Sequence, residues 1–464
     1  MTRIWIFLLA AVLLPAGLAW SQEPAEPEPE QQTEEAQGPQ TLEERVQELE
    51  QQLRILGRQG EIDKEAAAEK AKTTASAVAG RDGFSLRSAD GAYVLRLRGY
   101  THFDARVFLD DEERPGADTF LLRRIRPIFE GTLAKFLDFR IMPDFAQGQT
   151  VLQDGYLEAR VSPRFRIRGG KFKPPVSLER LQSATDLLFV ERAFPTNLVP
   201  NRDLGIQFSG DVGTGGALNY AVGFFNGVPD GGSADVDTND GKDVAARLFY
   251  TAPKESGLRG LGIGIGGSVG DQEGTTAAPG LPAFRTPAQA TFFSYRTDGT
   301  AAGTVIADGD RTRISPQGYF YRGSFGVLTE YAISSQEVRR GAEAVELEHR
   351  AWQVAASWVL TGGEPSFRGV NPKKPFDLAA DTWGDFELAA RVSRLELDDD
   401  TFPTFANPAS AAESAESFAI GLNWYLTRNL RWMLDYERTR FEGGSASGDR
   451  EDESVVFNRF QISF

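Results

Sequence analysis

Apolar and polar side chains alternate in short runs from residue 93 to the end of the chain. In FLDFRIMPDF (136–145), the odd positions are mostly apolar, whereas the even positions include Asp138, Arg140 and Asp144. Successive side chains point to opposite faces of a β-strand, so this period of two predicts strands with one apolar face. Each run is about as long as a tilted strand that crosses a bilayer. Similar runs occur at 95–107, 204–210, 218–225, 352–360, 418–426 and 430–440.

The connections between these runs alternate between short and long. Ser162-Pro163 and 427–429 are short, whereas 227–243 and 271–310 are long and polar. Outer-membrane barrels have short periplasmic turns and longer outer loops. We therefore predict an all-β fold, a transmembrane antiparallel β-barrel of about 16 strands formed by residues 81–464. This count requires the long connection 361–381 to lie on the periplasmic side.

Two further features bear on the barrel prediction. We assign the apolar stretch 292–295 to an outer loop rather than to an extra strand. The last run places Val456, Phe460 and Ile462 on one face and ends on Phe464, which resembles the end by which outer-membrane barrels are recognised for assembly. A soluble β-sandwich would also alternate, but such an end favours the barrel.

The first 80 residues have three different compositions. Residues 1–21 contain Arg3, a short apolar run and small residues near Ala19, which is typical of a secretory signal peptide. Residues 22–40 contain acids and prolines but no base, and predict a disordered spacer. Residues 41–80 are predicted to form a short periplasmic coiled-coil or helical segment. Its apolar seam is Leu42, Val46, Leu49, Leu53 and Leu56. An isolated amphipathic helix is the alternative.

Arginines occupy one face of the first predicted strands. Between Gln153 and Lys173 the sequence is QDGYLEARVSPRFRIRGGKFK, with arginine at every second position from 164 to 168 opposite an apolar row. The apolar row faces lipid, so the arginines face the lumen. The inward basic set is Arg96, Arg98, Arg106, Arg124, Arg126, Arg140, Arg160, Arg164, Arg166 and Arg168. The inward acids are Asp104, Glu130, Asp138, Asp144, Asp154 and Glu158. Excess arginine favours anions; the alternative is that these groups form structural ion pairs.

The connection that follows this arginine row is long and unusually apolar. Residues 171–203 read KFKPPVSLERLQSATDLLFVERAFPTNLVPNRD. Because burying this much apolar surface is favourable, we expect the loop to fold into the barrel and narrow it. Its cations Lys171, Lys173, Arg180 and Arg192 would then lie near the constriction.

These residues resemble the phosphate-selective porin O and P family of Gram-negative outer membranes. The similarity covers most of residues 93–464 and is sharpest in LLRRIRPIFEGT (121–132), in 153–173, in SLERLQSATDLLFVERAFP (177–195) and in LTGGEP (360–365). The resemblance implies a trimer of 16-stranded barrels with a pore-lining third loop that passes phosphate or polyphosphate. By the same resemblance the pore residues are Arg123, Arg124, Asp154, Arg180, Ser183 and Arg192. By this resemblance, the phosphate-specific type has lysine where Arg180 stands, and one of two neighbouring serines is kept as Ser183 whereas the next position is Ala184.

We therefore expect a porin for passive diffusion of anions, with phosphate or polyphosphate as solutes. A general or weakly selective porin, or a structural tether that uses the N-terminal helix, is the alternative. We expect no enzymatic activity, no cofactor and no metal, because the chain has no cysteine and two histidines without a catalytic motif. A formal net charge of −16 argues against nucleic acid. The expected partners are inorganic anions, outer-membrane lipids and two further copies of the chain.

Overall fold

The computed structural model describes residues 41–80, 82–109, 112, 116–237 and 239–464. The predicted signal peptide and spacer, 1–40, lie outside the described residues. The chain divides into two compact units, one ending at Glu69 and one beginning at Lys70. The N-terminal unit contains most of α1 (Leu42–Thr73), whose seam residues Leu42, Val46, Leu49, Leu53 and Leu56 are exposed. Within the described ranges, no helix is long and apolar enough to span a membrane.

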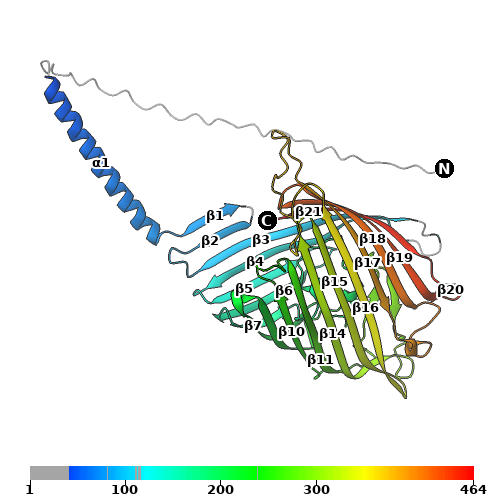
Figure 1. The fold of residues 1–464 in the computed structure, drawn as a ribbon. Helices are drawn as coiled ribbons and strands as arrows, with labels where there is room; N and C mark the ends of the chain where they lie inside the picture. Colours follow the sequence, from blue (N-terminus) through cyan, green and yellow to red (C-terminus); the bar gives the residue numbers. More distant parts are fainter. Residues whose placement is uncertain (1–40, 81, 110–111, 113–115, 238) are drawn as a thin grey trace, which may run out of the picture. The chain divides into compact units, whose positions relative to one another are not determined.

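The second unit is a closed antiparallel barrel (Figure 1). Its main sheet has 19 strands in the described part of the chain. Setting aside β1, β2 and β20, which add to the rim, leaves 16 barrel strands, as predicted. The first eight are β3 (Val94–Leu109), β4 (Thr119–Leu133), β5 (Leu137–Asp144), β6 (Val151–Ser162), β7 (Phe165–Phe172), β8 (Asp203–Val212), β9 (Leu218–Phe225) and β10 (Asp243–Thr251). The others are β11 (Leu261–Glu273), β14 (Ile306–Arg322), β15 (Phe325–Arg340), β16 (Glu343–Val359), β17 (Asp385–Glu396), β18 (Ala412–Tyr425), β19 (Leu430–Ser445) and β21 (Glu453–Ser463).

The barrel closes because its last strand pairs with its first. β21 lies antiparallel to β3, with Phe460 opposite Phe103 and Arg459 opposite Asp104. Phe103 and Phe460 are exposed on the outer face, whereas Arg459 and Asp104 are fully covered in the lumen. Alternation along each strand thus separates a lipid-facing apolar surface from a polar interior.

A short hairpin precedes the barrel where we expected helix. β1 (Ser76–Gly80) pairs with β2 (Gly83–Arg87), and β2 pairs with the start of β3. The prediction of a helical segment through residue 80 is therefore wrong for 76–80. β-Branched Thr74 and Val78 favour a strand, unlike the Ala/Lys/Glu run before them, and the hairpin turn lies between the paired residues Gly80 and Gly83. The barrel itself begins at Val94 rather than at residue 81.

Two of the unusual connections lie where the sequence predicted them. The long segment between β16 and β17, residues 360–384, joins the strands at the same end as the short turn between β18 and β19. The apolar stretch 292–295 lies in an outer loop. There, β12 (Ala283–Arg285) and β13 (Thr291–Ser294) form a separate two-stranded sheet. β20 (Gly448–Asp449) extends β19.

The barrel encloses a hydrophobic core, to which two inserted loops contribute together with strand residues and residues 397–411. The third loop, residues 173–202, contains α2 (Leu178–Leu181) and the 3-10 turn η1 (Phe194–Asn197). The fifth loop, residues 274–305, contributes buried Phe284 and Phe292, and the ring of Phe292 lies 5.7 Å from that of Phe194. Both loops thus fold inward, the third as predicted and the fifth unexpectedly. The remaining short turns are η2 (Thr214–Gly216) and η3 (Asp399–Thr401).

Candidate functional site: a cation-lined constriction

The third loop is attached to one side of the barrel wall. The backbone N–H of Leu178 donates to Glu330 on β15 at 2.9 Å, and that of Val190 donates to Asp435 on β19 at 2.6 Å. Phe194 donates in the same way to Ser393 on β17 at 3.1 Å. An inserted loop must satisfy its backbone groups without water, and the polar lumen supplies the partners. The loop therefore lies against β15–β19 and leaves a passage along the opposite wall.

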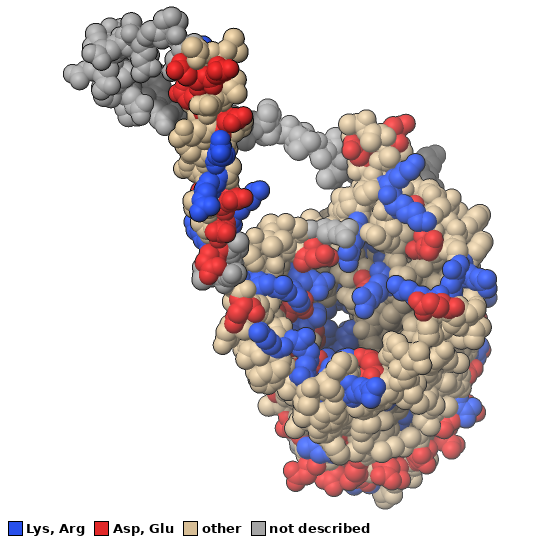
Figure 2. All heavy atoms as spheres, turned by 60° about the vertical axis from the view of Figure 1, so that its left-hand side comes forward, with Lys and Arg blue, Asp and Glu red and all other residues tan. Residues whose placement is uncertain are grey.

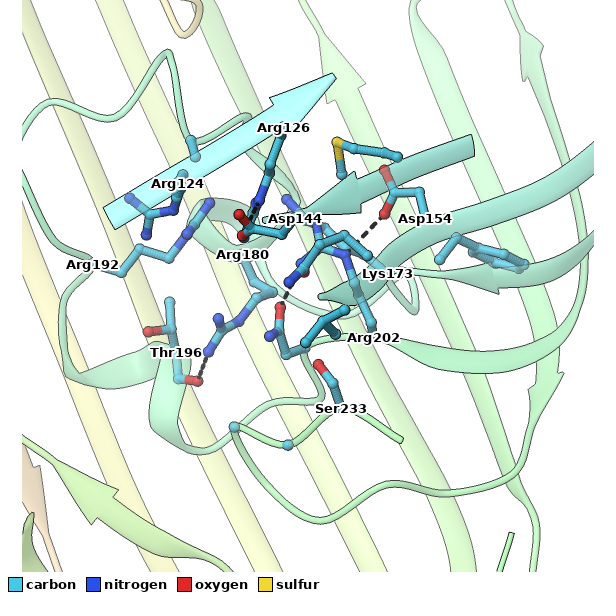
Figure 3. A pocket seen from close by; sticks show the side chains of 18 of the residues that line it. Arg124, Arg126, Asp144, Asp154, Lys173, Arg180, Arg192, Thr196, Arg202 and Ser233 are labelled. Atoms are coloured by element: carbon cyan, nitrogen blue, oxygen red, sulfur yellow. Dashed lines mark hydrogen bonds and ion pairs between the residues drawn. The ribbon is translucent and has the colours of Figure 1, made fainter. Parts of the chain in front are cut away.

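That passage is a cavity of about 880 Å³. It is bordered by β3–β7, by the third loop and by residues 281–289 of the fifth loop. Figure 3 shows Lys173, Arg180, Arg192 and Arg202 gathered in it, with Arg124 and Arg126 nearby on β4. On the face of the molecule seen in Figure 2, lysine and arginine side chains surround the hollow, whereas acids gather along the lower rim. The cavity is therefore positive within an acidic protein.

Three cations of the third loop interact with carbonyl oxygens instead of carboxylates. We call Lys173, Arg180 and Arg192 the loop cations. Lys173 Nζ and Arg192 Nη2 both donate to the carbonyl of Gln182, each at 2.9 Å. Arg180 donates to the carbonyl of Thr196, and its buried Nε has no partner. Within the described residues, no carboxylate oxygen lies within the 4.0 Å ion-pair limit of these three side chains.

The loop cations repel one another in a partly dry site. Burial, followed by the charges of Arg192 and Arg202, lowers the pKa of Arg180 to about 9. Burial lowers the pKa of Arg192 to about 10, so both guanidiniums still carry their charge at pH 7. The pKa of Lys173 is held well below its ordinary value, first by burial and then by Arg192 and Arg202. An anion entering the cavity would relieve this repulsion.

The arginines of the strand wall, in contrast, are mostly paired. Arg126 Nε lies 2.7 Å from Asp144, and Arg140 lies 3.2 Å from Asp154. Further lumen pairs are Arg98–Glu130, Arg140–Glu130, Arg160–Asp138, Arg166–Asp211 and Arg168–Glu158. The structural alternative that we considered for the arginine row therefore describes this wall. The loop cations, in contrast, have no carboxylate partner among the described residues.

A β-bulge places two consecutive arginines in the lumen. In the pairing of β3 with β4, Arg124 lies opposite His102 and Leu122 lies opposite Phe103, so Arg123 is the extra residue. Alternation is interrupted at this point, and both Arg123 and Arg124 border the cavity. A second bulge, between β5 and β6, inserts Gln153 beside Asp154.

Glu191 of the third loop lies among the arginines of the wall. Its carboxylate is 2.6 Å from Arg123 Nε and 3.4 Å from Arg124 Nη2. Arg106 is at 3.3 Å and Arg459 at 3.6 Å. Burial alone would raise the pKa of Glu191, but these four guanidiniums hold it well below its usual value. We call Arg106, Arg123, Arg124 and Arg459 the arginine nest.

Most of the other predicted pore residues also border the cavity. Asp154 contacts Arg140 and also Arg202, whose Nε donates to it at 2.9 Å. Ser183 is exposed in the cavity and lies 2.8 Å from the hydroxyl of Thr185. Lys171 is the exception, because it lies on β7, forms an ion pair with Asp235 and does not border the cavity. Its expected place at the constriction is therefore wrong.

Sequence reasoning missed three contributors to the site. Arg202 lies at the end of the third loop, directly before β8, and its pairing with Asp154 on β6, two strands away, has no local signal. Glu191 immediately precedes Arg192, and its acidic character gave no hint that four arginines surround it. Gln289 of the fifth loop also borders the cavity and contacts Arg123 at 3.5 Å.

A closed antiparallel barrel whose lumen is narrowed by an inserted, cation-bearing loop defines an outer-membrane porin. Comparison of the chain with known protein families and solved structures agrees with this class. The chain belongs to the phosphate-selective porin O and P family, whose pattern matches residues 95–464. No significant similarity to a curated protein sequence was found.

Several solved outer-membrane channel structures are similar to this chain at low sequence identity. The outer membrane channel DcaP of Acinetobacter baumannii has a TM-score of 0.52 and 11% identity, covering 84% of this chain and 100% of DcaP. OmpT of Vibrio cholerae has a TM-score of 0.49 and 13% identity, covering 80% of this chain and 98% of OmpT. An anion-selective porin from Comamonas acidovorans has a TM-score of 0.48 and 11% identity, covering 80% of this chain and 100% of the Comamonas porin. The DcaP match supports the shared barrel.

Proposed function

We propose that this porin conducts anions, and that inorganic phosphate and short polyphosphates bind at its constriction. The observation that carries the proposal is the set of loop cations, Lys173, Arg180 and Arg192, which border the cavity and have carbonyl rather than carboxylate partners. Rings of lysine and arginine at a narrow point favour anions. Family membership supports phosphate as the solute. The protein acts by passive diffusion and has no catalytic role.

The carbonyl partners of the loop cations allow these side chains to bind a solute anion and to release it. A carbonyl oxygen positions a guanidinium or ammonium group without neutralising it, so the charge remains available to a passing solute. Arginine donates in a planar fork that matches two oxygens of an oxyanion. Asp154 also borders the cavity and forms ion pairs with Arg202 and Arg140, which reduces the positive charge that these arginines offer to a solute. It therefore limits how tightly an anion binds, and conduction requires release as well as entry.

The function can be tested by recording single barrels in planar bilayers. A salt gradient of potassium chloride gives the reversal potential, and phosphate or pyrophosphate is then added to measure block of the chloride current. The proposal expects a reversal potential on the anion side and block by both phosphates. A cation-selective wild-type channel, or chloride current that neither phosphate blocks, would reject it.

We further propose that the porin is a homotrimer whose helix α1 extends into the periplasm. The exposed apolar seam of α1, from Leu42 to Leu56, supports association of helices from different copies. The same seam supports the second candidate, in which the helix tethers the outer membrane to another layer of the envelope. Deleting residues 22–80 distinguishes association of helices within the trimer from tethering. If the helix is a tether, the deletion abolishes attachment to the other envelope layer while conductance stays unchanged.

A further inference from the structure

The arginine nest has the geometry of an oxyanion site whose occupant is Glu191. Arg123 donates to both carboxylate oxygens, from Nε at 2.6 Å and from Nη2 at 3.3 Å. Arg124 approaches one oxygen, and Arg106 and Arg459 approach the other. Guanidinium forks bind phosphate with the same two-oxygen geometry that they use for carboxylates.

The nest is charged beyond what structural pairing requires. Its four arginines face two carboxylates, Glu191 and Asp104, which leaves a formal charge of 4 − 2 = +2. Asp104 forms its ion pair with Arg459, whose Nε and Nη2 each lie 2.6 Å from a carboxylate oxygen. Glu191 is therefore the acceptor shared by all four guanidiniums.

The nest also belongs to the solute path. Arg123, Arg124 and Glu191 border the same cavity as the loop cations, and Glu191 directly precedes Arg192 in the chain. The fifth loop meets the nest as well, because Arg106 donates to the carbonyl of Ala288 at 3.1 Å. Only 3% of the Glu191 side chain is exposed, so its carboxylate is an inner acceptor and not a surface charge.

We propose that Glu191 sets how tightly the pore binds anions, because its carboxylate occupies an oxyanion site of the arginine nest and excludes solute anions from it. This inference rests on the proposed anion function. Two anion sites therefore lie along the solute path. The site at the loop cations is accessible to solute anions, whereas the site at the arginine nest is occupied by the carboxylate of Glu191. The internal carboxylate keeps the second site from trapping phosphate.

The test replaces Glu191 by glutamine, which keeps the shape and removes the charge. Glu191→Gln removes the charge that holds this side chain on the guanidiniums, so an oxyanion can displace the neutral amide. Half-block of the chloride current then requires about ten-fold less phosphate, the factor expected for one added charge-assisted hydrogen bond. The reversal potential moves further to the anion side. Glu191→Asp keeps the negative charge, so it does not reproduce this ten-fold gain in sensitivity to phosphate.

A matched control separates charge from loop anchoring. Asp186→Asn removes one carboxylate charge from the same loop, but Asp186 accepts a hydrogen bond from the Thr185 hydroxyl and does not border the cavity. It leaves phosphate block unchanged. The inference is overturned if Glu191→Gln leaves block unchanged or weakens it, or if Asp186→Asn strengthens block equally.

Two further outcomes keep the inference distinct from the proposed function. If removal of the loop cations abolishes phosphate block while Glu191→Gln has no effect, the inference fails and the function stands. If wild-type channels show no anion preference, both fail. Should Glu191→Gln not assemble as a heat-modifiable barrel, refolding in high phosphate restores assembly, because the free anion replaces the carboxylate. Failure of phosphate to restore it overturns the inference.

Discussion

Removing Arg180 and Arg192 together should abolish most of the phosphate affinity of the pore. Each guanidinium is worth about 1.5–3 kcal/mol to a charged acceptor. We take the lower value because both also donate to carbonyl oxygens of the third loop. The two losses sum to about 3 kcal/mol, so Arg180→Ala/Arg192→Ala should weaken phosphate block by more than about a hundred-fold. Planar-bilayer recordings measure this, and the reversal potential in a salt gradient should shift toward cations.

The matched control removes the same charge from exposed positions. Arg87→Ala/Arg164→Ala changes residues on β2 and at the β6–β7 turn, where solvent and salt screen the charge. Its phosphate block should stay within a few-fold of wild type. The reasoning is refuted if Arg180→Ala/Arg192→Ala keeps wild-type anion preference while Arg164→Ala alone loses it, because the third loop would then not be the filter.

Three further predictions follow from the same structure. Anion preference should fall as pH rises, because burial and neighbouring arginines depress the pKa of Lys173 and deprotonation removes one positive charge from the constriction; reversal potentials of Lys173→Met should change less with pH than those of the wild type. In detergent the protein should give a β-rich circular dichroism spectrum and heat-modifiable gel migration, and a mainly helical spectrum would contradict the fold. Deleting 22–80 should leave a trimer by sedimentation, because two heptads contribute little; a purely monomeric product would contradict this.

The strand pattern was predictable because alternation is a local property of each strand. The prediction of 16 strands also required the alternation of short turns and long loops. It was correct although one connection at the short-turn end, residues 360–384, is long. The inward fold of the third loop was predictable from its apolar content. The inward fold of the fifth loop was not, because Phe284 and Phe292 find their partners only in the assembled barrel.

The site could be predicted only in part, for reasons visible in single residues. Lys171 follows two glycines and was assigned to the loop, but the strand continues through it and its odd position matches the outward row. The inward direction of Arg123 contradicts simple parity, because a bulge depends on the register of the neighbouring strand. Glu191 acquires its surroundings from β3, β4 and β21, which are distant in sequence.

Because Arg123 is the extra residue of a bulge, its deletion would change the charge of the pore without reversing the alternation of β4. On β4, Leu122 lies opposite outward-facing Phe103, whereas Arg124 lies opposite buried His102. Deleting Arg123 would join these two positions into a regular ladder and remove one lumen cation, while every other side chain keeps its face. A single-codon deletion or insertion could therefore alter solute preference without exposing a charge to lipid. The bulge at Gln153 offers a second position of the same kind.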